Sequence, residues 1–360
     1  MTILDIEAVK NRVIQGEELN KQDALELALH APLQALCQAA NEIREQLCGK
    51  KFNLCSIINV KSGRCPENCS YCAQSARFET DCETYDVLSQ EAVLQFAQSH
   101  EAEDTHRFSL VASGRGIKEN SRDLNKYCAI YEALEDKTSL HLCASLGLAD
   151  VPALKQLKAS GVQTYHHNLE SSRRFYAKIC TTHTYEDRVQ TCKNALAVGM
   201  DICSGGIFGL GENMEDRIDM ALELRSLGVT SVPINILTPI KGTPLENAPP
   251  LTTEEILRSI AIYRFLLPKA YLRFAGGRNN LGSEVKTALK SGINSALTGN
   301  FLTTQGDTID SDKKMIKSLG FDLELGDDRR IKLTPLHNRY KSNFTTYYKQ
   351  GIIPTINRSK

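Results

Sequence analysis

The sequence predicts an α/β protein of the TIM-type (β/α)8 barrel class, with helices before the barrel and an extension after it. Its 360 residues fit one α/β barrel, and eight short β-branched or apolar segments alternate with longer amphipathic ones. A doubly wound sheet is the competing class, but it seldom reaches so many regular units. We assign residues 1–50 to N-terminal helices, 51–320 to the barrel and 321–360 to the extension.

The predicted elements follow in the order that a barrel requires. Residues 20–46 are rich in Ala, Leu, Glu and Gln and predict two helices that break at Pro32. Thr252 and Glu255 have the spacing of a capping box, and Gly228 marks a helix end before a strand. We expect strands at Leu54–Val60, Arg107–Ala112, Ser139–Ser145, Val162–Asn168, Met200–Gly205, Thr230–Ile236, Tyr271–Ala275 and Ile293–Leu297.

Composition excludes several classes of protein. Hydrophobic residues make up 41% and charged residues 24% of the chain, which is typical of a soluble globular protein. No apolar run is long enough to span a membrane and residues 1–10 have no apolar core, so we expect no secretory signal and a cytoplasmic location. The 43 basic and 43 acidic side chains cancel, which argues against a general nucleic-acid or membrane-surface binder.

The zero net charge is the sum of two unlike parts. Residues 329–360 carry eight basic and no acidic residues, which leaves 35 basic against 43 acidic residues in the rest of the chain. Aromatic residues lie between these basic ones, a pattern that also occurs in nucleic-acid binding: Tyr340, Phe344, Tyr347 and Tyr348. We favour a tail that packs on its own acidic barrel or on a partner subunit.

Twelve cysteines in a reducing compartment indicate a metal, redox chemistry or burial. Cys65, Cys69 and Cys72 form a CxxxCxxC loop directly after the first predicted strand. Three thiolates so close together can hold an iron–sulfur cluster and leave one iron open for a substrate. Zinc with Cys82 as a distant fourth ligand is the alternative, and three buried free thiols are less favoured in a polar loop.

This cysteine spacing, with Tyr71 before the last cysteine, resembles the signature of the radical S-adenosylmethionine (SAM) enzymes. Further strings resemble biotin synthases in the order of that family, over roughly residues 20–320: Val162–Ser172, Ile179–Tyr185, Ile202–Glu212, Ser231–Asn235 and Lys241–Leu245. The resemblance implies a [4Fe–4S] cluster that binds SAM and a SAM-derived radical. It also implies insertion of sulfur into dethiobiotin from an auxiliary iron–sulfur cluster, of [2Fe–2S] or larger type.

The resemblance also implies residue roles and partners. The SAM contacts of the family fall on Tyr71, Glu170, Arg188 and Ile207. Arg188 is chemically suited, because a guanidinium can bind a carboxylate with two hydrogen bonds. An electron donor such as flavodoxin or ferredoxin and a homodimer are implied by the family as well.

The dethiobiotin contacts of the family fall on Asn168 and Asn235, whose amides can donate to and accept from a ureido ring. A third contact falls on His166, where the family pattern has Asn. Because adjacent strand residues face opposite sides, we expect only one of His166 and His167 to point into the barrel.

The auxiliary cluster is where the sequence departs from the family pattern. Three cysteines and an arginine are usual; Cys143, Cys203 and Arg273 match, but the remaining position holds Ser109, and serine is a poorer ligand for iron. Cys55 lies on the first predicted strand, where the pattern has no cysteine. With the other three it falls on predicted strands one, three, five and seven, and alternate strands share interior layers of a barrel. We predict Cys55 as the replacement ligand; the alternative is a small buried residue.

Six cysteines remain outside the two predicted cluster sites. We expect a structural role for the cysteines on predicted helices and assign none to those in loops: Cys37, Cys48, Cys128 and Cys192, then Cys82 and Cys180. A related radical SAM enzyme of hydrogenase-cofactor or pyrrolysine-pathway type is the alternative within the class, although residues 165–172 and Cys203 favour biotin synthase. From another class, a metal-cluster sensor that binds nucleic acid is the alternative.

Overall fold

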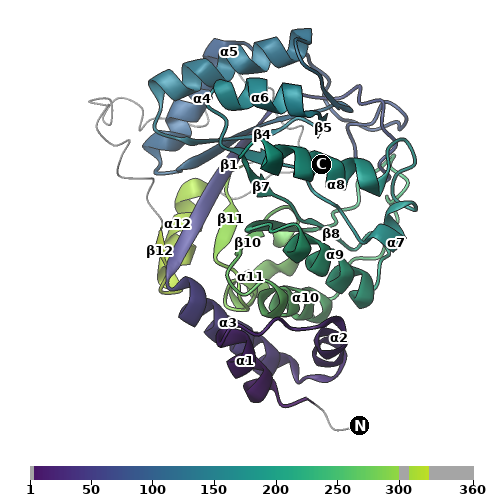
Figure 1. The fold of residues 1–360 in the computed structure, drawn as a ribbon, viewed down its shortest axis with the longest axis vertical. Helices are drawn as coiled ribbons and strands as arrows, with labels where there is room; N and C mark the ends of the chain where they lie inside the picture. Colours follow the sequence, from purple (N-terminus) through teal and green to yellow (C-terminus); the bar gives the residue numbers. More distant parts are fainter. Residues whose placement is uncertain (1–3, 300–307, 324–360) are drawn as a thin grey trace.

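A closed barrel of parallel strands forms the centre of the molecule (Figure 1). The computed structural model describes residues 4–299 and 308–323. The strands run around the barrel in the order β10, β11, β1, β2, β4, β6, β7, β9, and β9 pairs with β10 to close the ring. Their bounds are β1 (Lys51–Lys61), β2 (Arg107–Ala112), β4 (His141–Ser145), β6 (Thr164–His166), β7 (Asp201–Cys203), β9 (Ser231–Ile236), β10 (Tyr271–Phe274) and β11 (Ser295–Leu297). The predicted barrel class is confirmed, and every expected strand overlaps one of these.

Short strands add to the sheet. β8 (Gly206–Phe208) follows β7 and pairs with β9, and β12 (Asp322–Leu323) pairs with the start of β1. A separate pair joins β3 (Gly116–Ile117) to β5 (Leu148–Ala149). The basic segment 329–360 lies outside the described residues, and the chain divisions at 50 and 320 stay predictions.

The helices that follow the strands cover the outside of the barrel (Figure 1). Thr252 and Glu255 form the predicted capping box: the Thr252 hydroxyl accepts from the N–H of Glu255 at 3.2 Å, and the Glu255 carboxylate accepts from the N–H of Thr252 at 3.1 Å. No helix in the described ranges is long and apolar enough to cross a membrane. The helices are α4 (Gln90–Ala102), α5 (Arg122–Lys137), α6 (Val151–Ala159), α7 (Arg173–Tyr176), α8 (Tyr185–Ala197), α9 (Met214–Ser226), α10 (Thr253–Leu266), the 3-10 helix η1 (Arg278–Glu284), α11 (Val285–Leu289) and α12 (Ile309–Ser318).

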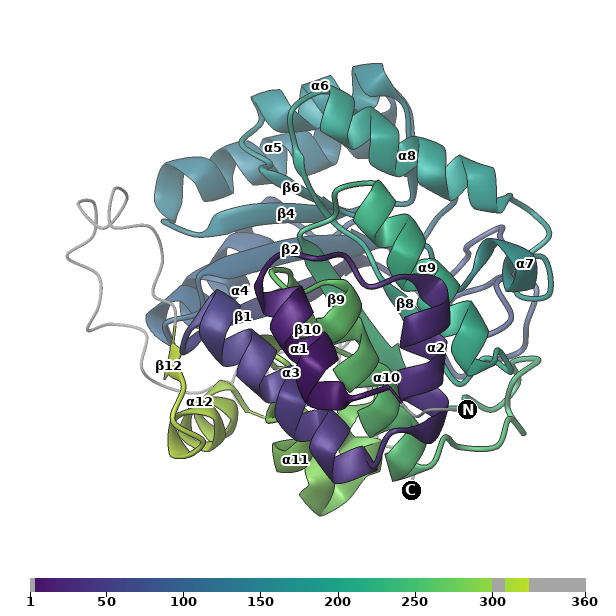
Figure 2. The same ribbon diagram turned by 60° about the horizontal axis from the view of Figure 1, so that its bottom comes forward.

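Three N-terminal helices lie across the end of the barrel from which the strands start (Figure 2). They are α1 (Ile6–Ile14), α2 (Lys21–His30) and α3 (Leu33–Cys48), and the break between α2 and α3 falls at Pro32 as predicted. α1 falls within residues 1–50, which we assign to N-terminal helices, although the sequence pattern marked out individual helices only at residues 20–46. It begins after Asp5, whose carboxylate accepts from the N–H of Glu7 at 3.0 Å. Arg258 of α10 donates to the carbonyl of Ala31 at 2.7 Å and ties this layer to the barrel.

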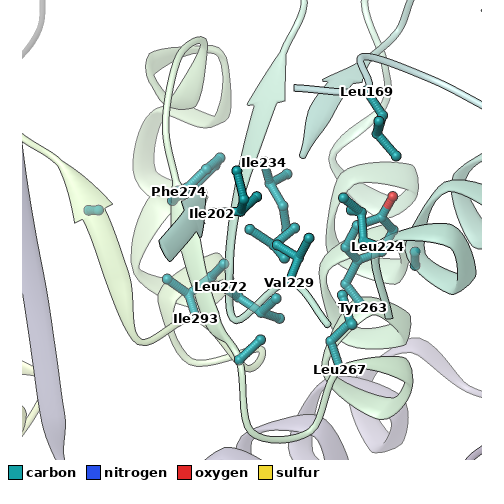
Figure 3. Packing of buried hydrophobic residues seen from close by; sticks show 14 of the residues in the cluster. Leu169, Ile202, Leu224, Val229, Ile234, Tyr263, Leu267, Leu272, Phe274 and Ile293 are labelled. Carbon is teal, nitrogen blue, oxygen red and sulfur yellow. The ribbon is translucent and has the colours of Figure 1, made fainter. Parts of the chain in front are cut away.

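Apolar side chains fill the layer between the sheet and the helices. Figure 3 shows Ile202 of β7 and Leu272 of β10 in one cluster with Tyr263 of α10. All three are 2% exposed or less. Because alternate strand residues face opposite sides, the residues next to Ile202 and Leu272, which are Cys203 and Arg273, face the interior of the barrel.

Candidate functional site

The cysteine loop follows the C-terminal end of β1, the end of a barrel where active sites lie. Gly63 starts the loop with a φ of 71°, and a Cβ there would lie 2.3 Å from a threonine hydroxyl, so only glycine fits without a shift. The N–H of Cys65 donates to the carbonyl of Gln74 at 3.0 Å, which closes the loop on itself. The N–H of Cys72 donates to the carbonyl of Cys69, also at 3.0 Å, which forms a turn between these two cysteines.

Of the cysteines in this loop, Cys69 is buried and Cys65 and Cys72 are half-buried, and none forms a disulfide. Burial raises the pKa of Cys65, and it raises the pKa of Cys72 to about 11, with a smaller contribution from the neighbouring Cys65. Such thiols stay protonated at neutral pH until a metal ion displaces the proton. Three soft donors on one closed loop fit an iron–sulfur cluster that keeps one iron open.

A second loop, residues 179–183, is clamped against the cysteine loop. Asn68 Oδ1 accepts hydrogen bonds from the N–H groups of Thr181 and Thr182, at 3.0 and 3.2 Å. The N–H of Ser70 donates to the carbonyl of Ile179 at 2.9 Å. These bonds fix the position of the second loop relative to the cysteine loop, although Asn68 and Thr181 are 113 residues apart in the chain.

Cys180 and His183 of the second loop lie beside Cys69. The ligand atoms of these three residues all lie within 4.8 Å of one another. Hydrogen bonding between the two thiols raises the pKa of Cys69 and lowers the pKa of Cys180. His183 is also hydrogen-bonded to Glu67 and to the hydroxyl of Tyr176. From the sequence we assigned Cys180 no role. The available signal was its position within residues 179–185, one of the segments that resemble biotin synthases.

The residues implied for SAM lie together near the cysteine loop. Arg188 Nη1 lies 3.6 Å from Glu170 Oε1, and both side chains are buried. Burial opposes the charge of Arg188, but the neighbouring Tyr71 and Glu170 outweigh it and raise the pKa of Arg188. Tyr71 and Ile207 pack against the same small apolar cluster. Charged side chains that can bind the polar ends of a ligand therefore lie side by side with apolar side chains that can pack against the rest of it.

Glu170 has a strained backbone with a φ of 69°, in the left-handed region. The N–H of Ile207 donates to its carbonyl at 3.0 Å. A Cβ at Gly206 would lie 2.5 Å from the same carbonyl oxygen, so glycine permits this close approach. Strain of this kind persists where the surrounding structure fixes it, often at functional sites.

The amides of Asn168 and Asn235 have protein partners. Asn168 Oδ1 accepts from the N–H of Gly205 at 3.2 Å, and its Nδ2 donates to Glu170 at 3.3 Å. Asn235 Oδ1 accepts from the N–H of Gly276 at 2.9 Å, and its Nδ2 donates to a backbone carbonyl at 3.1 Å. An amide has two donors and two lone pairs, so each retains capacity for a ligand.

Three thiols and two guanidiniums meet inside the barrel. Cys55, Cys143 and Cys203 are 3% exposed or less. Arg107 Nη2 lies 3.6 Å from Cys143 Sγ and is also close enough to interact with the charges of Cys55 and Cys203, while Arg273 acts on Cys55. Burial raises the pKa of Cys143, but the hydrogen bond with Cys55 and the charge of Arg107 outweigh burial and lower it well below its ordinary value. The four residues predicted for the auxiliary cluster are thus close together.

Neither guanidinium forms an ion pair with a carboxylate of the described residues. Arg273 donates to Asn53 Oδ1 at 2.8 Å, and Arg107 donates to Thr164 Oγ1 at 2.9 Å. The Nε atom of each arginine is buried without a hydrogen-bond partner. A buried cation without a counter-ion is costly, so this interior is suited to an anionic group. An iron–sulfur cluster held by thiolates fits that requirement.

Ser109 and His166 face each other across the barrel interior. Ser109 Oγ lies 3.3 Å from His166 Nδ1, and a charge on His166 would act on Cys143. The ring of His167 lies instead 6.3 Å from the ring of Tyr165, on the other side of the strand. The two histidines therefore point to opposite sides, as the alternation of strand residues predicts.

Arg107 is the interior residue that sequence reasoning missed. It stands two residues before Ser109 on β2, so both side chains share one face of the strand. The available signal was that Arg107 is a basic residue two positions before Ser109, where the family pattern has a cluster ligand. The cysteines expected on helices do lie on helices, namely Cys37 and Cys48 on α3, Cys128 on α5 and Cys192 on α8.

Known protein families match both halves of the barrel. The model of the Radical SAM superfamily matches residues 59–224, and that of the Biotin and Thiamin Synthesis associated domain matches residues 233–322. The biotin synthase of Campylobacter hominis is 59% identical over 318 residues, which cover 88% of this chain and 98% of that protein. The biotin synthase of Fusobacterium nucleatum is 55% identical, with 88% of this chain and 90% of that protein covered.

Solved structures agree with the fold. Methylornithine synthase has a TM-score of 0.77 at 20% identity, covering 88% of this chain and 97% of that one. The FeFe-hydrogenase maturase HydG from Carboxydothermus hydrogenoformans also has a TM-score of 0.77, at 17% identity, covering 90% and 80%. At such identities the likeness concerns the fold alone, whereas the relatives above half identity decide the family. The chain belongs to the biotin synthase family within the radical SAM superfamily.

Proposed function

We propose that this chain forms biotin from dethiobiotin by inserting sulfur, with the residue roles given below. The observation that carries the proposal is the pairing of two soft-donor sites in one barrel. One is the loop of Cys65, Cys69 and Cys72 after β1. The other is the interior, where three thiols and two guanidiniums meet without a carboxylate among the described residues.

Enzymes of this family use a [4Fe–4S] cluster, SAM and an auxiliary iron–sulfur cluster. When bound, these groups supply the radical that activates a C–H bond and the sulfur atom that is inserted. We assign the [4Fe–4S] cluster to the cysteine loop. We assign the auxiliary cluster to the interior residues Cys55, Cys143, Cys203 and Arg273.

The chain's own groups position SAM. Arg188 presents a guanidinium that matches the carboxylate of SAM in charge and shape. Glu170 is poised to accept hydrogen bonds from the ribose hydroxyls, because its strained backbone holds the carboxylate near Arg188. Tyr71 and Ile207 provide an apolar wall that excludes water.

The chain's own groups also position dethiobiotin. Asn168 and Asn235 each keep one donor and one lone pair beyond their protein contacts, which matches the N–H and C=O groups of a ureido ring. Asn168 contacts Glu170, so a residue assigned to dethiobiotin and a residue assigned to the ribose of SAM share one hydrogen-bond network. This link supports the placement of both ligands at the same end of the barrel.

Cys55 takes the place of the ligand that Ser109 does not provide. Cys55 is fully buried, and its thiol hydrogen-bonds with that of Cys143. This bond and burial raise the pKa of Cys55, so a bound iron has to displace its proton. These contacts favour a ligand over an inert buried residue.

The test compares Cys55→Ala with Cys37→Ala, a buried cysteine on α3 that serves as the matched control. Each full-length variant is reconstituted anaerobically, and iron, acid-labile sulfide, SAM cleavage and biotin are measured. We expect Cys55→Ala to lose the auxiliary iron and biotin formation but to keep the [4Fe–4S] cluster and SAM cleavage. Full auxiliary iron and sulfide in Cys55→Ala would overturn the assignment.

We also propose a flavodoxin- or ferredoxin-type electron donor, a homodimer and a cytoplasmic location for this enzyme. The first two follow from the family, and the location follows from the composition. Sedimentation of the reconstituted protein tests the dimer: a monomer at micromolar concentration would contradict it.

A further inference from the structure

Ser109 lies beside the interior thiols, because on β2 it is directly paired with Cys143 of β4. Its hydroxyl is fully buried and hydrogen-bonded to His166 Nδ1 at 3.3 Å. Serine is a hard and poor ligand for the irons of a sulfide cluster. The role of Ser109 therefore depends on what His166 does.

His166 lies between two residues that we assign to the auxiliary cluster. On β6 it is directly paired with Cys203 of β7. Thr164, two residues earlier on the same face, is paired with Cys143 of β4. Directly paired residues of neighbouring strands carry their side chains next to each other. The imidazole therefore lies next to the Cys203 side chain and diagonally from that of Cys143, and it reaches toward the same interior space.

The hydrogen bond with Ser109 decides which ring nitrogen of His166 can bind a metal. A histidine ligand usually donates its other ring N–H to a neighbouring acceptor, and that bond fixes the tautomer. If Nδ1–H donates to Ser109 Oγ, the lone pair is on Nε2. Among residues 4–299 and 308–323, no hydrogen bond occupies Nε2 of His166. Imidazole is an established ligand of iron–sulfur clusters.

We propose that His166 Nε2 binds an iron of the auxiliary cluster in the position assigned above to Arg273, whose guanidinium already donates to Asn53 Oδ1, and that Ser109 is a positioning residue that fixes the tautomer. This inference rests on the proposed function, because it uses the cluster assigned there. It replaces the role of His166 as a contact to dethiobiotin. The other interior histidine, His141, has its Nε2 engaged at 2.7 Å by Thr164 and serves as the control.

The experiment is pulsed electron paramagnetic resonance on the reconstituted full chain, with histidine alone labelled with ¹⁵N. Cys65, Cys69 and Cys72 are replaced by alanine in all samples so that the auxiliary cluster alone is observed, poised in a paramagnetic state. Labelling only histidine separates its nitrogens from those of Arg273. We expect a strong ¹⁵N coupling that disappears in His166→Asn and remains in His141→Gln.

A second variant distinguishes loss of the histidine ligand from loss of the whole cluster in His166→Asn. His166→Cys offers a thiolate at the same position, so we expect it to retain auxiliary iron without the ¹⁵N coupling. Absence of a strong histidine coupling in the parent protein, or its persistence in His166→Asn or His166→Cys, would overturn the inference. If the wild-type enzyme forms biotin while that coupling is absent, only the role of His166 fails. If no auxiliary cluster assembles in the parent protein, the proposed function fails as well.

Discussion

Arg107 and Arg273 place two positive charges inside the barrel, and the described residues supply no carboxylate to pair with them. Three thiolates nearby would balance these charges, and the guanidiniums would in turn stabilise the thiolates. Without a cluster, Cys143, whose pKa is lowered well below its ordinary value, balances one of these charges and the other remains a cost to the folded protein. Removal of the Arg107 charge should therefore affect cluster binding more than the stability of the metal-free protein.

Arg107→Met tests this balance. We expect the stability of the metal-free protein to change by less than about 1 kcal/mol, because Arg107 is half-buried and Cys143 can take up a proton once the neighbouring charge is gone. After reconstitution we expect less auxiliary iron, because one stabilising cation is gone. Thermal unfolding and iron analysis measure the two effects.

Arg264→Met is the matched control for Arg107→Met. Arg264 is fully buried, whereas Arg107 is half-buried, and it donates to the carbonyls of Gly292 and Ala270 and to Asn294 Oδ1, at 2.8, 2.9 and 3.0 Å. Its loss leaves buried acceptors unsatisfied, so we expect a destabilisation of roughly 3 kcal/mol or more and no specific loss of auxiliary iron. If Arg107→Met destabilised the metal-free protein to the same degree and kept all its auxiliary iron, the account of the interior charge would be wrong.

Single residues differ in how well the sequence predicted their surroundings. Cys55 was predictable, because strand number and the period of two place it inside the barrel with Cys143. Cys180 was not, because its contact with Cys69 joins two loops, and no periodicity governs loop geometry. Arg107 was predictable in principle from its spacing to Ser109, but a lone basic residue on a strand is commonly exposed.

Among the elements, the loop at residues 179–183 braces the cysteine loop through Asn68. One side chain satisfies two backbone N–H groups, and its Nδ2 also donates to the Thr181 hydroxyl at 2.7 Å. The cysteine loop also has ties of its own, such as the bond from the N–H of Cys65 to the carbonyl of Gln74. The second loop adds to them from outside.

Asn68→Ala removes this clamp without replacing a cysteine. Five side-chain hydrogen bonds are lost, one of them donated by the Cys180 thiol, so we expect a local destabilisation of roughly 2 kcal/mol and a clear loss of [4Fe–4S] iron, with auxiliary iron retained. Asn125→Ala on the exposed face of α5 is the control and should change neither. Iron analysis with Mössbauer spectroscopy separates the two clusters; equal iron in both variants would count against the clamp.

Element boundaries show where sequence patterns are informative and where they are not. β2 matches its predicted range, and the capping box fixes the start of α10. β6 spans only Thr164–His166 of the predicted Val162–Asn168, because the chain leaves the sheet to form the site: the N–H of Leu169 donates to the carbonyl of Gly205 at 2.9 Å. The apolar pattern of a segment does not show at which residue its pairing with the neighbouring strands ends.

At the scale of the whole molecule, the barrel joins the two soft-donor sites. The cysteine loop extends from the end of β1, and Cys55 lies within the same strand. The α1–α3 layer covers the opposite end (Figure 2). The arrangement supports one enzyme in which the radical forms at the open end of the barrel and sulfur is held inside it.

The most direct measurement is a single-turnover reaction with the auxiliary cluster reconstituted from ³⁴S-sulfide. The full-length enzyme, SAM, dethiobiotin and a reductant are incubated anaerobically, and the products are analysed by mass spectrometry. The account predicts biotin that carries ³⁴S, in an amount limited by the auxiliary cluster. Formation of 5′-deoxyadenosine without biotin, or biotin without the label, would contradict it.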